Sequence, residues 1–101
     1  MATVRYSPAA EADLDAILDD LNRKDPAVAA RYAAEFEQKG HALSQFPEIG
    51  RSRPEIAPNL RSTLVRSYVI FYRAEGDAVQ ILRILHGKMD LRGIMSVEDG
   101  R

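Results

Sequence analysis

Three runs of apolar residues in the C-terminal half form the strongest pattern in the sequence. They cover residues 60–66, 68–73 and 78–86 and are rich in β-branched and aromatic side chains, which suit a pleated surface. Only Ser67 separates the first run from the second. Polar residues 74–77 separate the second from the third and include Gly76, which can adopt the positive φ of a tight hairpin. The pattern predicts a three-stranded antiparallel meander.

The predicted sheet is apolar on both faces. Successive side chains of a strand point to opposite faces, so alternation in the last run assigns residues 79, 81, 83 and 85 to one face and residues 80, 82, 84 and 86 to the other. Both faces then mix large apolar side chains with polar ones. We therefore expect the sheet to be covered twice, by the chain's own helices and by a partner protein.

Two amphipathic helices precede the sheet. Ser7-Pro8 and Asp25-Pro26 each place an N-cap residue before a proline at the first helical position. The first helix should end near residue 22 or 23, and its aspartates lie off the apolar stripe, which predicts a solvated acidic face. That stripe consists of Ala10, Leu14, Ile17, Leu18 and Leu21. The second helix covers residues 26–45, and Gly40 on its inner stripe predicts a close approach to a neighbouring element.

The remaining segments complete the fold prediction. Residues 2–6 alternate weakly and form a short first strand at an edge of the sheet. Residues 46–59 contain three prolines and one glycine, which indicates a long loop without regular structure. Residues 91–97 could form a short helix, and residues 98–101 should fray. The prediction is an α+β domain over residues 1–97, of order β-α-α-β-β-β, with an αα hairpin packed on a small, twisted, mostly antiparallel sheet.

Composition narrows the class of protein. Of the 101 residues, 46% are hydrophobic and 29% charged, which is ordinary for a soluble globular domain. There is no cysteine, which excludes disulfides and cysteine-based zinc sites. No signal sequence or membrane-length apolar run is visible, so we expect a cytoplasmic protein. Acidic residues outnumber basic ones in residues 1–22, and basic residues outnumber acidic ones in residues 61–92. This asymmetry favours either an anionic partner on the sheet side or two solvated faces.

Several local strings together resemble the ParE branch of the ParE/RelE toxin superfamily of bacterial type II toxin–antitoxin systems. The strings occur in the order and at the distances of that family and span about residues 3–92. They are ADLDAI at residues 12–17, FPEIG at residues 46–50, Arg61, YVIFYR at residues 68–73 and ILRILHGKMD at residues 81–90.

The resemblance implies a toxin that is neutralised by a ParD-like antitoxin in a hetero-oligomeric complex. ParE toxins are described as poisons of DNA gyrase, whereas RelE-like relatives are ribosome-dependent mRNA endonucleases. The resemblance to the ParE branch favours a binding protein with no catalytic residues and no direct sequence-specific binding to nucleic acid. The two distant histidines and the lack of a carboxylate array at ligand spacing predict no metal site. We also expect no cofactor and no membrane association. A third possibility is an inert member that is kept for its antitoxin-bound complex.

The resemblance and the apolar sheet together suggest two sets of binding residues. We expect a helix of the antitoxin beside the αα hairpin and an extended segment on a sheet edge. The residues expected to bind the antitoxin are Tyr68, Ile70, Tyr72, Arg73, Leu82, Arg83 and Ile84. The residues expected to bind the target are Arg61, Arg66, His86, Lys88 and Met89.

The alternative function as a ribonuclease depends on basic residues of the sheet. Metal-free cleavage of RNA needs a base, an acid and cations that stabilise the transition state. Arginine cannot act as the base, which leaves His86 as the plausible acid or base near neutral pH. In this alternative the catalytic residues are Arg61, Arg83, His86 and Lys88. His41 has no charged cluster near it in sequence and is expected at the surface.

Overall fold

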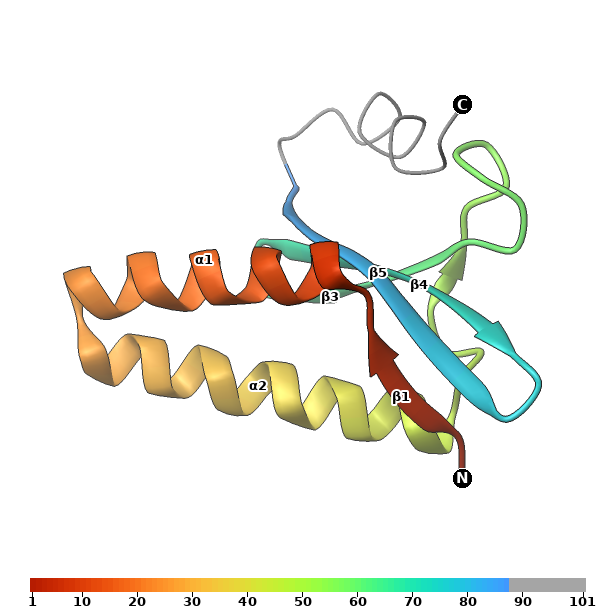
Figure 1. Cartoon of the computed structure of the whole chain (residues 1–101), viewed down its shortest axis with the longest axis horizontal. Coiled ribbons are helices and arrows are strands. Elements are labelled where there is room, and N and C mark those ends of the chain that lie inside the picture. The colour runs from red at the N-terminus through yellow and green to blue at the C-terminus, as the bar shows by residue number, and fades with distance from the viewer. Residues whose placement is uncertain (88–101) are drawn as a thin grey trace.

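The computed structural model describes residues 1–87, which form two helices packed on one sheet (Figure 1). The helices are α1 (Pro8–Lys24) and α2 (Pro26–Gln45). The strands are β1 (Thr3–Tyr6), β2 (Arg51–Ser52), β3 (Arg61–Val65), β4 (Tyr68–Glu75) and β5 (Ala78–His86). The order in the sheet is β1-β5-β4-β3-β2, with β1 parallel to β5 and the other neighbours antiparallel. The α+β fold, the meander and the edge position of the first strand are confirmed.

The helix starts follow the predicted capping. The Ser7 hydroxyl accepts a hydrogen bond from the Ala10 N–H at 3.0 Å, and the Asp25 carboxylate accepts one from the Ala27 N–H at 3.0 Å. Each cap satisfies an N–H group that a helix start leaves without an intrahelical partner. Asp25 also ends α1, because its N–H donates to the Leu21 carbonyl. The two helices therefore form a hairpin with one connecting residue.

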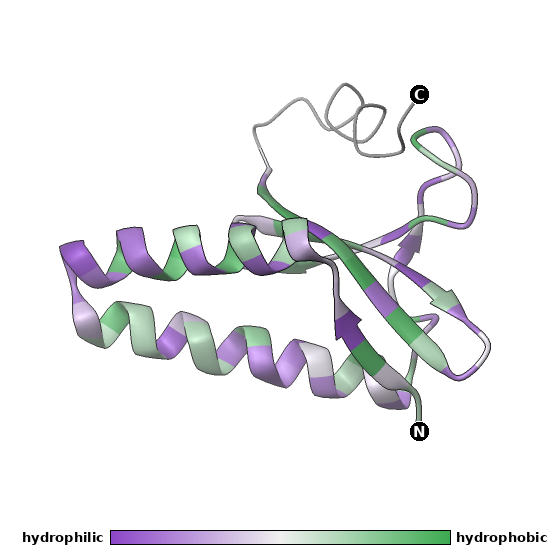
Figure 2. Cartoon of the chain, viewed as in Figure 1, coloured by the Kyte–Doolittle hydropathy of each residue, from purple (hydrophilic) through white to green (hydrophobic). Residues whose placement is uncertain are grey.

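The helices cover one face of the sheet and enclose the main core. Tyr72, Ile81 and Ile84 from the sheet pack with Phe36 and Leu43 of α2, and all five are buried. Figure 2 shows a largely hydrophobic β5 with hydrophilic interruptions, beside helices of mixed character. Gly40 is buried, with the Tyr6 hydroxyl 3.5 Å from the position of an added Cβ. The predicted close approach at Gly40 thus exists, at ordinary van der Waals distance.

The second face of the sheet is covered in part by the chain's own loop, which corrects the prediction that a partner must supply that cover. A smaller core contains Leu60 and Ala57 from the loop and Phe71 and Val69 from β4, with Ile56 and Leu82 against it. The proline-rich segment folds back over the sheet because its apolar residues can exclude water there. The sheet is therefore not an open apolar platform.

The prediction that side chains alternate strictly along the last strand is also wrong. Phe71 pairs with Arg83 and Tyr72 pairs with Ile81, so Leu82 is an extra residue in β5. Such a bulge reverses the facing of the residues that follow it. Ile84 consequently joins Ile81 in the main core, although the sequence period places them on opposite faces.

Two further differences concern turns and loops. The loop between α2 and β3 includes the two-residue strand β2, whose Arg51 and Ser52 pair with Ser62 and Arg61, so the prediction of no regular element there is wrong. The turn between β3 and β4 uses Arg66 as well as Ser67, and Arg66 has a φ of 54°. Helix α1 ends one residue later than expected. The predictions for residues 91–97 and 98–101 lie outside the described residues.

Candidate functional site

The loop that follows α2 is held by two side chains of the sheet. The buried Tyr72 hydroxyl accepts a hydrogen bond from the Gly50 N–H at 2.8 Å and donates one to the Pro47 carbonyl at 2.8 Å. The Arg61 guanidinium donates to the Gly50 carbonyl at 2.8 Å and to the Glu48 carbonyl at 3.3 Å. Burial raises the pKa of the Tyr72 phenol, against the hydrogen bond from Gly50, which lowers it. Residues 47–50 are therefore fixed in one conformation.

Gly50 is needed for this arrangement because of space. A Cβ at this position would overlap the Tyr72 hydroxyl and lie 2.7 Å from the ring carbon Cε1. Real Cβ contacts are longer than that, so any side chain would displace the tyrosine or the loop. Packing against Tyr72 thus explains the glycine in the string at residues 46–50.

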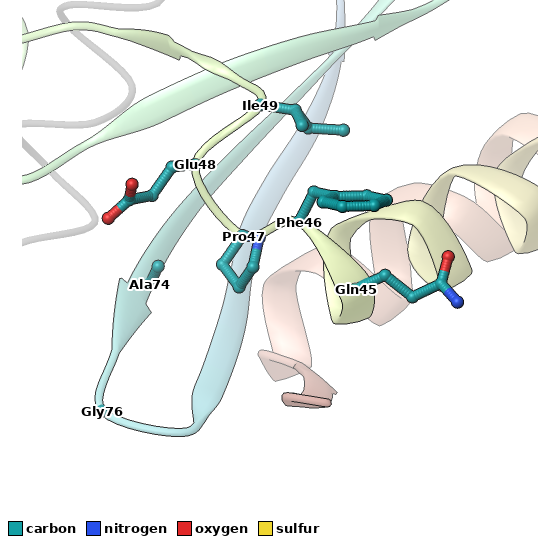
Figure 3. A pocket seen from close by; sticks show the side chains of 7 residues that line it. All are labelled: Gln45, Phe46, Pro47, Glu48, Ile49, Ala74 and Gly76. Atoms are coloured by element: carbon teal, nitrogen blue, oxygen red, sulfur yellow. The ribbon is translucent and has the colours of Figure 1, made fainter.

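The fixed loop exposes apolar side chains instead of burying them. Phe46 is 62% exposed and Ile49 51% exposed. Both line a hollow of about 610 Å³ together with Gln45, Pro47, Glu48, Ala74 and Gly76. Figure 3 shows Phe46 and Ile49 extending to the same side of the loop, near the end of α2, while Glu48 extends to the other side. The sequence predicts only a long loop without regular structure here, although a phenylalanine and an isoleucine beside proline and glycine are a visible signal of a binding surface.

A second candidate surface is the outer edge of β3. Val65 and Tyr68 pair across a two-residue turn, so Leu64 directs its N–H and C=O away from β4. Strand β2 pairs only with Ser62 and Arg61, and in residues 1–87 no strand pairs with Leu64 on that side. The Leu64 side chain is 60% exposed, beside a hollow of about 300 Å³. That hollow is lined by Glu35, Gln38, Lys39, Ala42, Leu64, Val65 and Arg66.

Arg66, an expected target-binding residue, is joined to α2. Its guanidinium makes a two-pronged ion pair with the Glu35 carboxylate, at 2.7 Å from Nη2 and 3.0 Å from Nε, and lies 4.9 Å from the centroid of the Tyr32 ring. This hydrogen bonding lowers the pKa of Glu35 and raises that of Arg66. Tyr68 stands edge-on to both the Tyr32 and His86 rings, with centroids 6.1 and 5.5 Å away. One aromatic and cationic cluster therefore joins the turn to α2.

Arg83, expected to bind the antitoxin, pairs with α1. Its Nε and Nη2 lie 2.7 and 2.9 Å from the two oxygens of Asp13, whose Oδ2 also accepts the Ile84 N–H at 2.9 Å. The prediction that Asp13 belongs to a solvated acidic face is therefore wrong. Strand β1 ends at Tyr6 and its pairing with β5 ends at Ile81, so β1 leaves room for a side chain at the Ile84 N–H. Asp13 takes that place, while Asp15, Asp19 and Asp20 are exposed.

The structure divides the other residues expected to bind the antitoxin. Ile70, Tyr72 and Ile84 have their side chains in the main core, at 2% exposure or less, so they are not available to a partner. Tyr68 and Leu82 are partly exposed, and the Arg73 Nε donates to the Pro58 carbonyl at 3.1 Å. His41 is exposed as expected.

The residues of the ribonuclease alternative do not meet in the described part of the chain. Arg61 lies opposite Tyr72 and Arg83 opposite Phe71, so their Cβ atoms point to different faces of the sheet. His86 pairs with Tyr68 at the start of β4, whereas Arg61 pairs with Tyr72 farther along that strand. Lys88 and Met89 lie outside the described residues.

Two other findings bear on the class of protein. Over residues 1–87, no three His, Asp or Glu side chains gather closely enough to hold a metal ion. Of the two described helices, neither is both long and apolar enough to cross a membrane.

Comparison with known proteins places these features in context. Residues 4–91 match the model of the family described as "ParE toxin of type II toxin-antitoxin system, parDE". Toxin ParE3 of Caulobacter vibrioides is 39% identical over 78% of this chain and 80% of its own length, and Toxin RelE1 of the same organism is 34% identical over 84% and 92%. The solved structure "Chromosomal ParDE TA system from P. aeruginosa" has a TM-score of 0.71 at 31% identity and covers 85% of this chain and 96% of its own.

Proposed function

The chain belongs to the ParE toxin family of type II toxin–antitoxin systems, within the ParE/RelE superfamily, and from this we propose that it is a poison of DNA gyrase held inactive by a ParD-like antitoxin. The name of the relative ParE3 and the likeness to a solved ParDE system support both an antitoxin partner and the ParE branch. The gyrase target rests on the resemblance to ParE toxins. No catalytic residue is assigned.

The unpaired edge of β3 is the observation that carries the antitoxin proposal. An extended segment of the antitoxin adds a strand there, using the outward N–H and C=O of Leu64. The hollow between α2 and β3 receives side chains that flank this strand. An unpaired edge with an exposed leucine invites aggregation unless a partner covers it, which the antitoxin does.

Tyr68, Arg73 and Leu82 complete the proposed antitoxin contacts, because they retain partial exposure. Arg83 is not part of the proposed interface, since its guanidinium is joined to Asp13 and its side chain is 18% exposed. Reversing its charge would disturb the docking of α1 and so would not test the interface. Arg61, Arg66 and His86 stay as proposed target contacts, together with Lys88 and Met89.

A supercoiling assay with purified gyrase tests the target. We expect the purified chain to inhibit supercoiling and to trap cleaved DNA, and we expect addition of the antitoxin to restore supercoiling. Normal supercoiling with no cleaved DNA at saturating toxin would contradict the proposal.

The alternative is a ribosome-dependent endonuclease. The relative Toxin RelE1 supports it, as does a likeness to a solved structure, with a TM-score of 0.57 at 29% identity. That structure is "The crystal structure of the toxin-antitoxin complex RelBE2 (Rv2865-2866) from Mycobacterium tuberculosis". The separation of Arg61 from Arg83 and His86 counts against it. Primer extension on translated mRNA distinguishes the two functions, because only the endonuclease leaves cuts at the ribosomal A site.

A further inference from the structure

The end of α2 carries a second apolar surface, on other residues than the edge of β3. Four large apolar side chains in the described part of the chain are exposed: Met1, Phe46, Ile49 and Leu64. Phe46 directly follows α2, and Ile49 lines the same hollow. The Ala2 N–H donates to the Ser44 carbonyl at 2.7 Å, which brings the backbone beside Met1 to this end of the helix. We call Phe46, Ile49 and the hollow that they line the α2-end surface.

This surface is built to stay exposed. The hydrogen bonds of Tyr72 and Arg61 fix residues 47–50 by their backbone, so Ile49 is held outward on a rigid support. The Phe46 N–H is also bonded, to the Ala42 carbonyl at 2.8 Å. A backbone that is already fixed loses little conformational entropy when a partner covers the side chains on it, which favours binding.

Negative charges near the α2-end surface favour a partner with positive charge. Glu48 and Glu75 line a neighbouring hollow and are exposed, and Asp77 at the adjoining turn is exposed as well. Within residues 1–87 none of the three carboxylates forms an ion pair. Arg61 lines the same hollow, and its guanidinium is bonded to backbone carbonyls.

The helix adds to this negative potential. The C-terminal end of an α-helix carries a partial negative charge, and the last turn of α2 contains no basic residue to offset it. From these observations we infer that the α2-end surface binds a polypeptide segment in which apolar side chains lie next to lysine or arginine. Resting on the proposed function, we assign this segment to a protein other than the antitoxin.

Nuclear magnetic resonance on the labelled chain tests the inference with two synthetic peptides, one of leucine and lysine and one of leucine and glutamate. We expect the leucine–lysine peptide to shift the amide signals of Phe46, Glu48 and Ile49 and to bind at least about tenfold more tightly than the leucine–glutamate peptide. Equal affinity for both peptides, or shifts spread over the whole chain, would overturn the inference.

Variants at exposed positions separate this surface from the edge of β3. The double variant Phe46→Ser, Ile49→Ser should weaken binding of the leucine–lysine peptide by about tenfold or more, because the buried apolar contact is lost. Leu64→Ser, at a similarly exposed leucine, should leave it unchanged. Glu48→Lys with Glu75→Lys should reverse the peptide preference. A Leu64→Ser effect as large as that of the double variant, or an unchanged preference in the charge variant, would contradict the assignment.

The last measurement repeats the titration on the toxin–antitoxin complex. We expect the Phe46 and Ile49 signals to shift as they do in the free chain, because the antitoxin occupies the edge of β3. Loss of these shifts in the complex would show that the antitoxin itself covers the α2-end surface. Failure of any antitoxin to bind would count against the proposed function, while the peptide titrations on the free chain would still decide whether the surface is a binding site.

Discussion

Tyr72 shows how one side chain links the core to a functional loop. Its ring lies in the main core, and its hydroxyl is bonded to two residues of the loop after α2. The ring explains why sequence reasoning could suggest Tyr72 as a partner's anchor, since an aromatic strand residue looks the same whether it faces a core or a surface. The hydroxyl instead gives the loop its shape.

Replacement of Tyr72 by phenylalanine should therefore destabilise the protein. The Gly50 N–H would lose its acceptor in a buried place, which costs about 1–3 kcal/mol of the free energy of unfolding. Urea denaturation measures this loss. Tyr6→Phe is the control, because the Tyr6 hydroxyl forms no hydrogen bond within residues 1–87, and we expect a change below about 0.5 kcal/mol there. Equal effects of the two substitutions would contradict the role given to the Tyr72 hydroxyl.

Gly40 is a position at which a substitution can stabilise the fold. Helical glycine is less favourable than alanine by about 0.5–1 kcal/mol, and the Tyr6 hydroxyl, 3.5 Å from an added Cβ, leaves room for a methyl group. Gly40→Ala should accordingly raise the free energy of unfolding by about that amount in thermal or urea denaturation. Gly50→Ala is the contrast, since its Cβ would overlap Tyr72, and it should lower stability. Destabilisation by Gly40→Ala would show that Tyr6 cannot tolerate the methyl group.

At the scale of elements, features that depend on neighbouring residues could be predicted from the sequence, whereas features that depend on how distant segments pair could not. The caps Ser7 and Asp25 act within a few residues, so the starts of both helices could be predicted. The bulge at Leu82 depends on how β4 and β5 meet, which no single strand reveals. Asp13 lies off the apolar stripe of α1, so the sequence places it in solvent. It accepts from the Ile84 N–H because β1 ends before it reaches that residue, which the sequence of α1 does not reveal.

The pair of Asp13 and Arg83 fastens α1 to β5, and its removal should be costly. The two side chains are 14% and 18% exposed, and Asp13→Ala removes both the paired carboxylate and the acceptor of the Ile84 N–H. We expect Asp13→Ala to lower the free energy of unfolding by about 3 kcal/mol. Asp19→Ala on the same helix removes an exposed pair with Arg23 and should cost less than about 0.5 kcal/mol. Similar losses for both would contradict the docking role of Asp13.

The pair of Glu35 and Arg66 joins α2 to the β3–β4 turn and makes stability depend on pH. Because the folded-state pKa of Glu35 is lowered, the stabilisation is complete above the unfolded pKa of about 4.3 and is lost as pH falls through the folded value. The melting temperature of the natural chain should exceed that of Glu35→Gln at pH 7, and the difference should shrink in acid. A difference that stays constant across this range would argue against the ion pair.

At the scale of the whole molecule, residues 1–87 leave two separate apolar surfaces exposed after folding. The main core and the loop-covered core use most of the apolar residues of the sheet, so the edge of β3 remains of the predicted open platform, and the α2-end surface lies on the loop beside it. The family and the fold could be recognised from strings along the sequence. The binding residues could not, because exposure of Leu64, Phe46 and Ile49 depends on the register of β2 and on the bonds of Tyr72.

Substitution at the edge of β3 tests where the antitoxin binds. Leu64→Asp places a charge where the proposed strand would bury an apolar side chain, and the affinity for the antitoxin should fall by about tenfold or more. Thr3→Asp, at an exposed position on the opposite edge strand, should leave the affinity unchanged. Isothermal titration calorimetry measures both. A greater loss for Thr3→Asp would move the proposed strand to β1.

Growth of cells in which this chain is induced, alone or together with its antitoxin, tests the central claim most directly. A toxin of this family that poisons gyrase should stop growth and leave DNA breaks with intact mRNA when it is induced alone, and growth should recover when the antitoxin is present. Unchanged growth on induction of the chain alone, or arrest that the antitoxin does not relieve, would contradict the account.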